Sequence, residues 1–132
     1  MNRLATAAAA ALMATGGALA QSPEEGAALF ATYCASCHGD AATGDGVMTG
    51  VLNIEVPDLT GLAAANGGVF PRARAAYQID GRDPILAHGG EMPFFGDLFD
   101  GEMAAFKTAS GQPILTGAGI ISLVLWLETI QP

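Results

Sequence analysis

The chain has 132 residues, of which 51% are hydrophobic and 14% are charged, and its formal net charge is −8. This length fits one domain rather than two. Thirteen acidic residues against five basic ones argue against a nucleic-acid binder, which needs a basic face for the phosphates. Two cysteines are too few for a framework of several disulfides.

The first twenty residues have the layout of a secretory signal peptide. Arg3 precedes a stretch of apolar or small residues from Leu4 to Leu19, and Ala18 and Ala20 supply the small residues that a signal peptidase inspects. We expect cleavage after Ala20 and export to the periplasm. The alternative is an uncleaved anchor, but the segment lacks the roughly 20 strongly apolar residues of a good span. Residues 21–132 retain thirteen acidic and four basic side chains, a net charge of −9.

The remainder of the chain predicts short helices joined by loops and hardly any strand. Ser22 and Glu25 form a capping box at the start of a helix from Pro23 to about Ala35. Glycine-rich loops separate the later elements. Further helices are expected over residues 58–65, 71–79, 101–108 and 117–130, the last with Thr116 as its N-cap.

The last predicted helix is apolar nearly all round, which implies burial on several sides. It is too short for a membrane span and ends in Glu128. We therefore expect it to pack in the core and expect no stable membrane insertion once the signal peptide is removed.

Both cysteines lie in the segment Cys34-Ala35-Ser36-Cys37-His38. This spacing is the attachment signature of c-type haem. Two thiols one helical turn apart can form thioethers with the two vinyl groups of one porphyrin. The adjacent imidazole is then held beneath the iron as an axial ligand. The predicted signal peptide agrees, because bacteria attach haem covalently outside the cytoplasm.

Two other chemistries use the same residue types. A thioredoxin-like redox pair also has a CxxC sequence, but it needs a βαβ context that this chain lacks. A zinc site could combine Cys34, Cys37, His38 and His88, but the chain has no second compact pair of ligands.

The chain resembles class I c-type cytochromes of the small bacterial periplasmic type. The resemblance covers most of residues 24–130 and rests on Gly26-x-x-Leu29-Phe30-x-x-x-Cys34-x-x-Cys37-His38-Gly39, Pro57-Asp58-Leu59-Thr60, Asp80-Gly81-Arg82 and His88-Gly89-Gly90-Glu91-Met92-Pro93. It implies an all-α cytochrome c fold of four to five short helices around one covalently attached haem. It also implies that the first and last helices cross, with Gly26 and Phe30 against the turn Leu123–Leu127.

The resemblance also implies the second axial ligand. Met92, followed by Pro93, matches the Met-Pro ligand motif of the family, whereas we expect Met48 and Met103 to fill gaps in the core. His88 is the alternative ligand, and it would make the iron bis-histidine. With His38 and Met92 as ligands, the iron has no open position.

Secondary contacts of the haem are less defined by the sequence. Arg72, Arg74 and Arg82 can pair with the haem propionates, or they can form a solvated helix face. In many relatives a proline follows the Gly-x-Gly after the haem motif, and its carbonyl accepts the second N–H of the histidine ligand. Here Val47 stands at that position, which leaves the acceptor for His38 open.

A six-coordinate haem implies a one-electron carrier, not an enzyme, and such a carrier docks transiently with a redox donor and acceptor. We expect the protein to be a monomer. The acidic balance indicates a basic or neutral docking face on the partner, or a salt-adapted surface with no docking role. Two alternatives are a haem subunit of a larger oxidoreductase complex and a catalytic or gas-binding haem protein with a labile sixth ligand.

Overall fold

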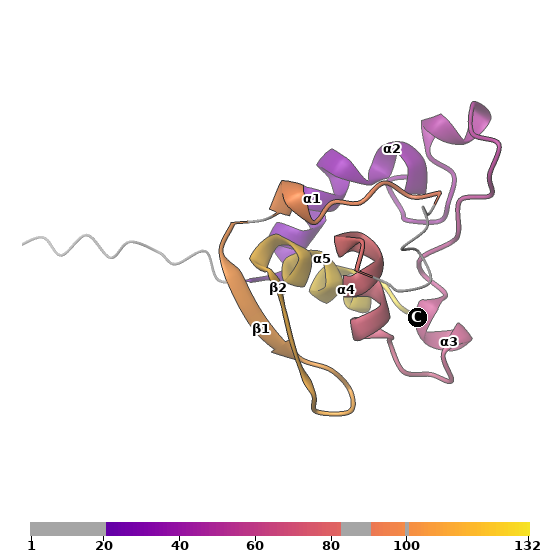
Figure 1. Cartoon of the computed structure of the whole chain (residues 1–132). Helices are drawn as coiled ribbons and strands as arrows, with labels where there is room; N and C mark the ends of the chain where they lie inside the picture. The colour runs from indigo at the N-terminus through magenta and orange to yellow at the C-terminus, as the bar shows by residue number, and fades with distance from the viewer. Residues whose placement is uncertain (1–20, 83–90, 100) are drawn as a thin grey trace, which may run out of the picture.

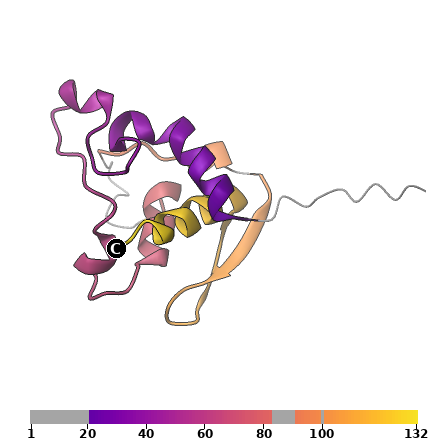
Figure 2. The ribbon, with the colours of Figure 1, turned by 180° about the vertical axis from the view of Figure 1, so that it is seen from behind.

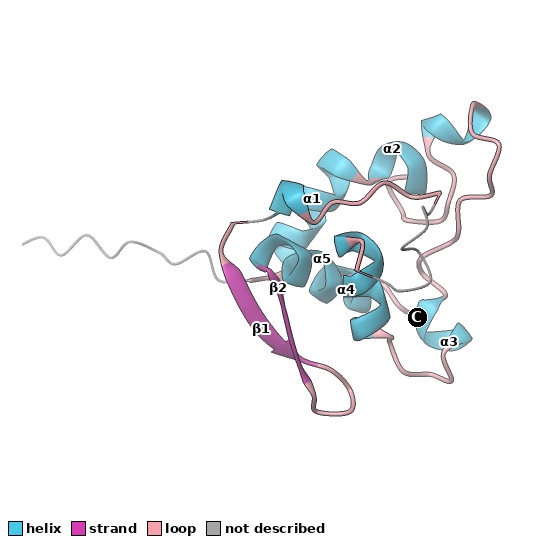
Figure 3. Cartoon of the chain, viewed as in Figure 1, coloured by secondary structure: helices cyan, strands magenta, loops and turns pink. Residues whose placement is uncertain are grey.

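The computed structural model of the protein describes residues 21–82, 91–99 and 101–132. The predicted signal peptide and His88 lie outside this range. The described part is rich in helix and contains one small sheet (Figures 1 and 3). Its elements are α1 (Pro23–Tyr33), α2 (Ala35–His38), η1 (Val47–Gly50), α3 (Leu62–Ala65), α4 (Arg72–Asp80), η3 (Asp97–Phe99), β1 (Met103–Lys107), β2 (Pro113–Gly117) and α5 (Ala118–Thr129).

The helices α1 and α5 cross at the centre of the domain. The Ser22 hydroxyl caps α1 by accepting a hydrogen bond from the backbone N–H of Glu25 at 3.2 Å. At the crossing, a Cβ atom on Gly26 would lie 1.9 Å from the carbonyl oxygen of Ser122, so only glycine allows this approach. Phe30 packs on Trp126 with ring centroids 4.4 Å apart. The predicted crossing of the first and last helices is therefore confirmed.

The core is built mainly around α5. The buried apolar side chains of this helix point to more than one side, as its all-round apolar sequence predicted. They meet Phe30 from α1 and Ala76 and Ile79 from α4 in one cluster. No helix in the described ranges is both long enough and apolar enough to cross a bilayer.

The predictions of a helix over 101–108 and of an all-α fold are wrong. Residues Met103–Lys107 form β1, which pairs antiparallel with β2, with Met103 opposite Gly117 and Lys107 opposite Pro113. Along β1 the side chains alternate between exposed and half-buried, the period of two expected for a strand with one covered face. Pairing with β2 and the inward position of Phe106 override the helix propensity of the short Met-Ala-Ala run.

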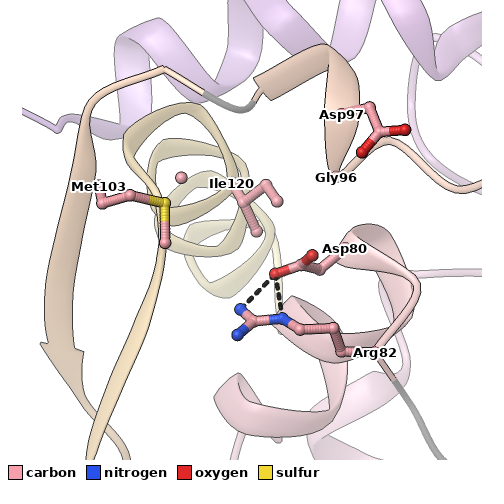
Figure 4. Close-up of a pocket in the computed structure, with 7 residues that line it drawn as sticks. Asp80, Arg82, Gly96, Asp97, Met103 and Ile120 are labelled. Atoms are coloured by element: carbon pink, nitrogen blue, oxygen red, sulfur yellow. Dashed lines mark hydrogen bonds and ion pairs between the residues drawn. The ribbon is translucent and has the colours of Figure 1, made fainter.

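Thr116 is not the N-cap of the last helix, which is a second correction. Gly117 holds that position, and α5 begins at Ala118. Thr116 is fully buried, and its hydroxyl donates a hydrogen bond of 2.7 Å to Oδ2 of Asp80 at the end of α4. Arg82 pairs with the same carboxylate (Figure 4) and also donates to the carbonyl of Leu115 at 2.9 Å. These contacts attach the hairpin to α4.

The substitution Thr116→Val is expected to lower the free energy of unfolding by about 2 kcal/mol, because it removes a hydrogen bond to a largely buried carboxylate. Urea denaturation followed by circular dichroism measures this change. Thr32→Val is the matched control, since the Thr32 side chain is exposed on α1. Equal stability of the two variants would contradict the role given to Thr116.

Candidate cofactor site

The Cys34–His38 motif lies where α1 ends and α2 begins. Cys34 separates the two helices, and its carbonyl accepts hydrogen bonds from the N–H groups of Cys37 at 3.1 Å and His38 at 2.9 Å. These bonds close a single helical turn, and both cysteines are free. The sequence prediction of one continuous helix through Ala35 therefore needs only a small adjustment, and the two thiols keep the one-turn spacing.

A glycine-rich loop holds the motif from the other side. The N–H of Gly46 donates to the carbonyl of Cys37 at 3.1 Å, and the N–H of Gly44 donates to the carbonyl of His38 at 2.8 Å. A Cβ on Gly46 would lie 2.4 Å from the carbonyl oxygen of Ser36. Glycine is needed at this position because the loop backbone lies directly against the motif.

One cavity brings the four predicted site residues together. It has a volume of about 160 Å³, and its lining is mostly apolar. Cys34, Cys37 and His38 line it from one segment, and Met92 lines it from the segment before η3. The rest of the lining consists of Tyr33, Ser36, Pro93 and Phe95.

A larger cavity of about 360 Å³ lies between the end of α4 and the hairpin (Figure 4). Its lining includes Asp80, Arg82 and Asp97. None of the four residues predicted for haem attachment and ligation lines it, and the Asp80 carboxylate is already bound to Arg82 and Thr116. The smaller cavity is therefore the candidate cofactor site, although it has less than half the volume of the larger one.

His38 is buried and is 7% exposed. Burial lowers the pKa of its imidazole, and a backbone contact with Pro57 opposes this shift. In the described part of the chain, the buried Nδ1 atom makes no hydrogen bond of standard geometry. The neutral imidazole that burial favours is the form that binds a metal. His38 therefore has the environment of an axial ligand.

The cysteine thiols do not have the character of a redox-active pair. Burial raises the pKa of the Cys34 thiol to about 11, and the neighbouring Cys37 adds to this shift. Thioredoxin-like pairs need a lowered cysteine pKa. The environment of Cys34 therefore argues against that alternative. Within the ranges that the structure describes, no three His, Cys, Asp or Glu residues are grouped so that they could hold a metal ion.

The residues of this cavity fit a covalently attached haem. Two free thiols lie one helical turn apart, next to a buried imidazole whose Nδ1 atom has no hydrogen-bond partner among the described residues. A methionine thioether comes from a second segment, and the walls are largely apolar, as a porphyrin requires.

The family comparison agrees with this chemistry. A family model described as "Cytochrome C oxidase, cbb3-type, subunit III" matches residues 21–107, more than half of the chain. The chain belongs to this family of c-type cytochromes. No curated protein and no solved structure matches it. The cytochrome carries haem c as its cofactor, and electron transfer is its general role. The predicted resemblance to class I c-type cytochromes is thus confirmed at the family level.

The backbone of Pro57, and not that of Val47, opposes the lowering of the His38 pKa, although the buried Nδ1 atom makes no hydrogen bond of standard geometry within the described residues. Val47 is exposed at the start of η1. Pro57 opens the motif Pro57-Asp58-Leu59-Thr60. That motif was the signal in the sequence that could have pointed to Pro57. The path of the loop, however, decides whether a proline after Gly-x-Gly, as in many relatives, or Pro57 lies beside the histidine.

Two of the three arginines considered for the propionates already have carboxylate partners. Arg72 pairs with Glu128, with Nε 2.9 Å from Oε2, and Arg82 pairs with Asp80. Arg74 is exposed and makes no ion pair in the part of the cytochrome that the structure describes. Propionate binding by these residues stays a prediction.

Proposed function

We propose that this cytochrome is a periplasmic one-electron carrier whose haem c is bound by Cys34 and Cys37 and ligated by His38 and Met92. The supporting observation is the cavity that these four side chains share. Met92 reaches it from a segment far along the chain, which is the arrangement expected when two protein ligands hold one iron from opposite faces.

Each residue has a distinct task in this proposal. The two cysteine sulfurs would fix the cofactor to one turn of the chain, and His38 and Met92 would ligate its iron. Haem c supplies a one-electron couple at its iron. Phe95 and Pro93 line the cavity beside Met92 and would limit the access of water there. The fixed ligand set keeps the geometry nearly constant in both oxidation states.

The matched family supports a second candidate function. Its description names a subunit of an oxidase, so the cytochrome is alternatively a haem subunit of a larger complex. Purifying the native protein under mild conditions distinguishes the two functions. A free carrier elutes alone at the size of one chain, whereas a subunit elutes with partner chains in fixed ratio.

Met92→Ala tests the proposed ligand set. The oxidised wild-type protein is expected to show the weak sulfur-to-iron charge-transfer absorption band, and the variant is expected to lose it because the thioether is gone. The reduced variant should also bind carbon monoxide rapidly at one site per haem. Rapid binding by the wild-type protein would instead indicate a gas-binding or catalytic haem.

Met48→Ala is the matched control, because Met48 is 41% exposed and does not line the cavity. The control is expected to keep the band and to bind carbon monoxide as slowly as the wild type. A band that persists in Met92→Ala would show that the sulfur ligand is not Met92. A wild-type protein without the band would favour His88 as the second ligand.

A further inference from the structure

Acidic and basic residues are segregated along this chain. Segments 33–38 and 92–95 line the haem cavity, and they lie within longer stretches, 21–71 and 91–106, that contain ten acidic residues and no basic one. Every basic residue after position 20 lies elsewhere, at Arg72, Arg74, Arg82 and Lys107.

Three of these four basic residues gather at the hairpin. Lys107 ends β1, and its carbonyl accepts a hydrogen bond from Arg72 at 3.3 Å. Arg82 donates to the carbonyl of Leu115 in β2 at 2.9 Å. The hairpin lies on the other side of α5 from α2 in both opposite views (Figures 1 and 2). Arg72 and Lys107 therefore lie on the hairpin side of α5. Arg82 follows Gly81, which packs against Phe94, but its charge is paired with Asp80.

Exposed apolar side chains accompany the acidic residues near the haem cavity. Tyr33 lines the cavity and is 40% exposed, and Phe94 beside Pro93 is 49% exposed. Val47, at the start of η1, is 88% exposed, and η1 packs against α2. Asp40 lies two residues after His38 and Glu91 lies directly before Met92, and both side chains are exposed.

We infer that this apolar and acidic face is the docking surface for a redox protein whose own contact face is apolar at its centre and rimmed by lysine or arginine. The inference rests on the proposed function, because it assigns the partner of the same haem site. Complementary charges speed the encounter of such partners, and an apolar centre allows close contact without a long-lived complex. The acidic residues of this surface thus favour a partner whose contact face carries lysine or arginine.

Small redox complexes test the charge of this face. Reduced hexaammineruthenium is a dication that gives one electron to the oxidised protein, so that ruthenium goes from Ru(II) to Ru(III) while iron goes from Fe(III) to Fe(II). Ferricyanide is a trianion that takes one electron from the reduced protein. Stopped-flow rates at an ionic strength of about 0.1 M are informative, because charges more than about 10 Å away are then largely screened.

Asp40→Asn and Glu91→Gln each remove one charge near the cavity. Each is expected to slow the reaction with the ruthenium complex at least ~2-fold and to speed the reaction with ferricyanide. Coulomb's law predicts an effect of this size when the small complex reacts about 7 Å from the removed charge. Glu24→Gln removes the same charge about 15 Å along α1 from Cys34. This control should change both rates by less than ~1.3-fold.

A lysine-rich c-type cytochrome serves as the protein probe, and the same probe with its lysines acetylated serves as the comparison. Electron exchange should be faster with the unmodified probe.

Val47→Ser should slow exchange with this unmodified probe at least ~2-fold and leave the ruthenium rate unchanged, because it alters only apolar contact. Faster exchange with the acetylated probe, or equal effects of the near and distant charge variants, would overturn the docking surface. The charge-transfer band of each variant is recorded in parallel, so a failure of the ligand set is recognised separately.

Discussion

Replacing both Cys34 and Cys37 with alanine is expected to make the haem fully extractable into acidified organic solvent. In the wild-type protein the two thioether bonds should keep the colour with the polypeptide. Acid would protonate the His38 imidazole and break the proposed bond to iron, so that only covalent bonds could hold the cofactor under these conditions. The absorbance of the organic and aqueous phases measures the result.

Ser36→Ala is the control for this experiment, because Ser36 lies between the two cysteines and is exposed. The control should retain all its haem in the aqueous phase. Retention of haem by the double alanine variant would mean that other residues attach the cofactor.

Gly26→Ala is expected to destabilise the protein by about 3 kcal/mol, because the added Cβ would lie 1.9 Å from the carbonyl oxygen of Ser122. Alanine favours a helix over glycine by about 1 kcal/mol, so intrinsic propensity alone predicts the opposite sign. The direction of the change therefore decides whether α1 and α5 cross in close contact. Denaturant unfolding of the haem-loaded protein measures it.

Gly50→Ala provides the comparison, since a Cβ at Gly50 meets no atom within 4 Å. Its stability should stay within about 0.5 kcal/mol of the wild type, as for other exposed positions. A stabilised Gly26→Ala variant would show that the two helices do not approach as closely as the structure has them.

The parts of the fold that local chemistry specifies could be predicted from the sequence. Ser22 and Glu25 marked the start of α1, and the apolar run of α5 indicated its burial. The close approach at Gly26, in contrast, was expected from the family resemblance. For α1 and α5, one segment carries enough information to fix its own start or its place in the core.

The hairpin could not be predicted in this way. Residues 103–107 include Met and two Ala, which favour helix, and they become a strand only because β2 pairs with them. Thr116 has a common N-cap residue type, but the carboxylate of Asp80 competes for its hydroxyl. Both errors come from contacts between segments that are distant in the sequence.

In the candidate site, too, the residues that act within one segment could be predicted, and those that depend on distant contacts could not. Cys34, Cys37 and His38 were predicted from their spacing, because the chemistry of attachment acts within one helical turn. Met92 was predicted only through the family resemblance, since nothing local distinguishes it from Met48 or Met103. The contact between Pro57 and His38 needed the path of the loop.

Cysteine alkylation with intact mass spectrometry tests the central claim most directly. The purified wild-type protein is unfolded without reductant and treated with iodoacetamide, and its intact mass is then measured. We predict a polypeptide that carries the mass of one haem and has no alkylated cysteine, because Cys34 and Cys37 are the two cysteines of the chain and both are proposed to form thioethers. A haem-free polypeptide with two alkylated cysteines would contradict the account.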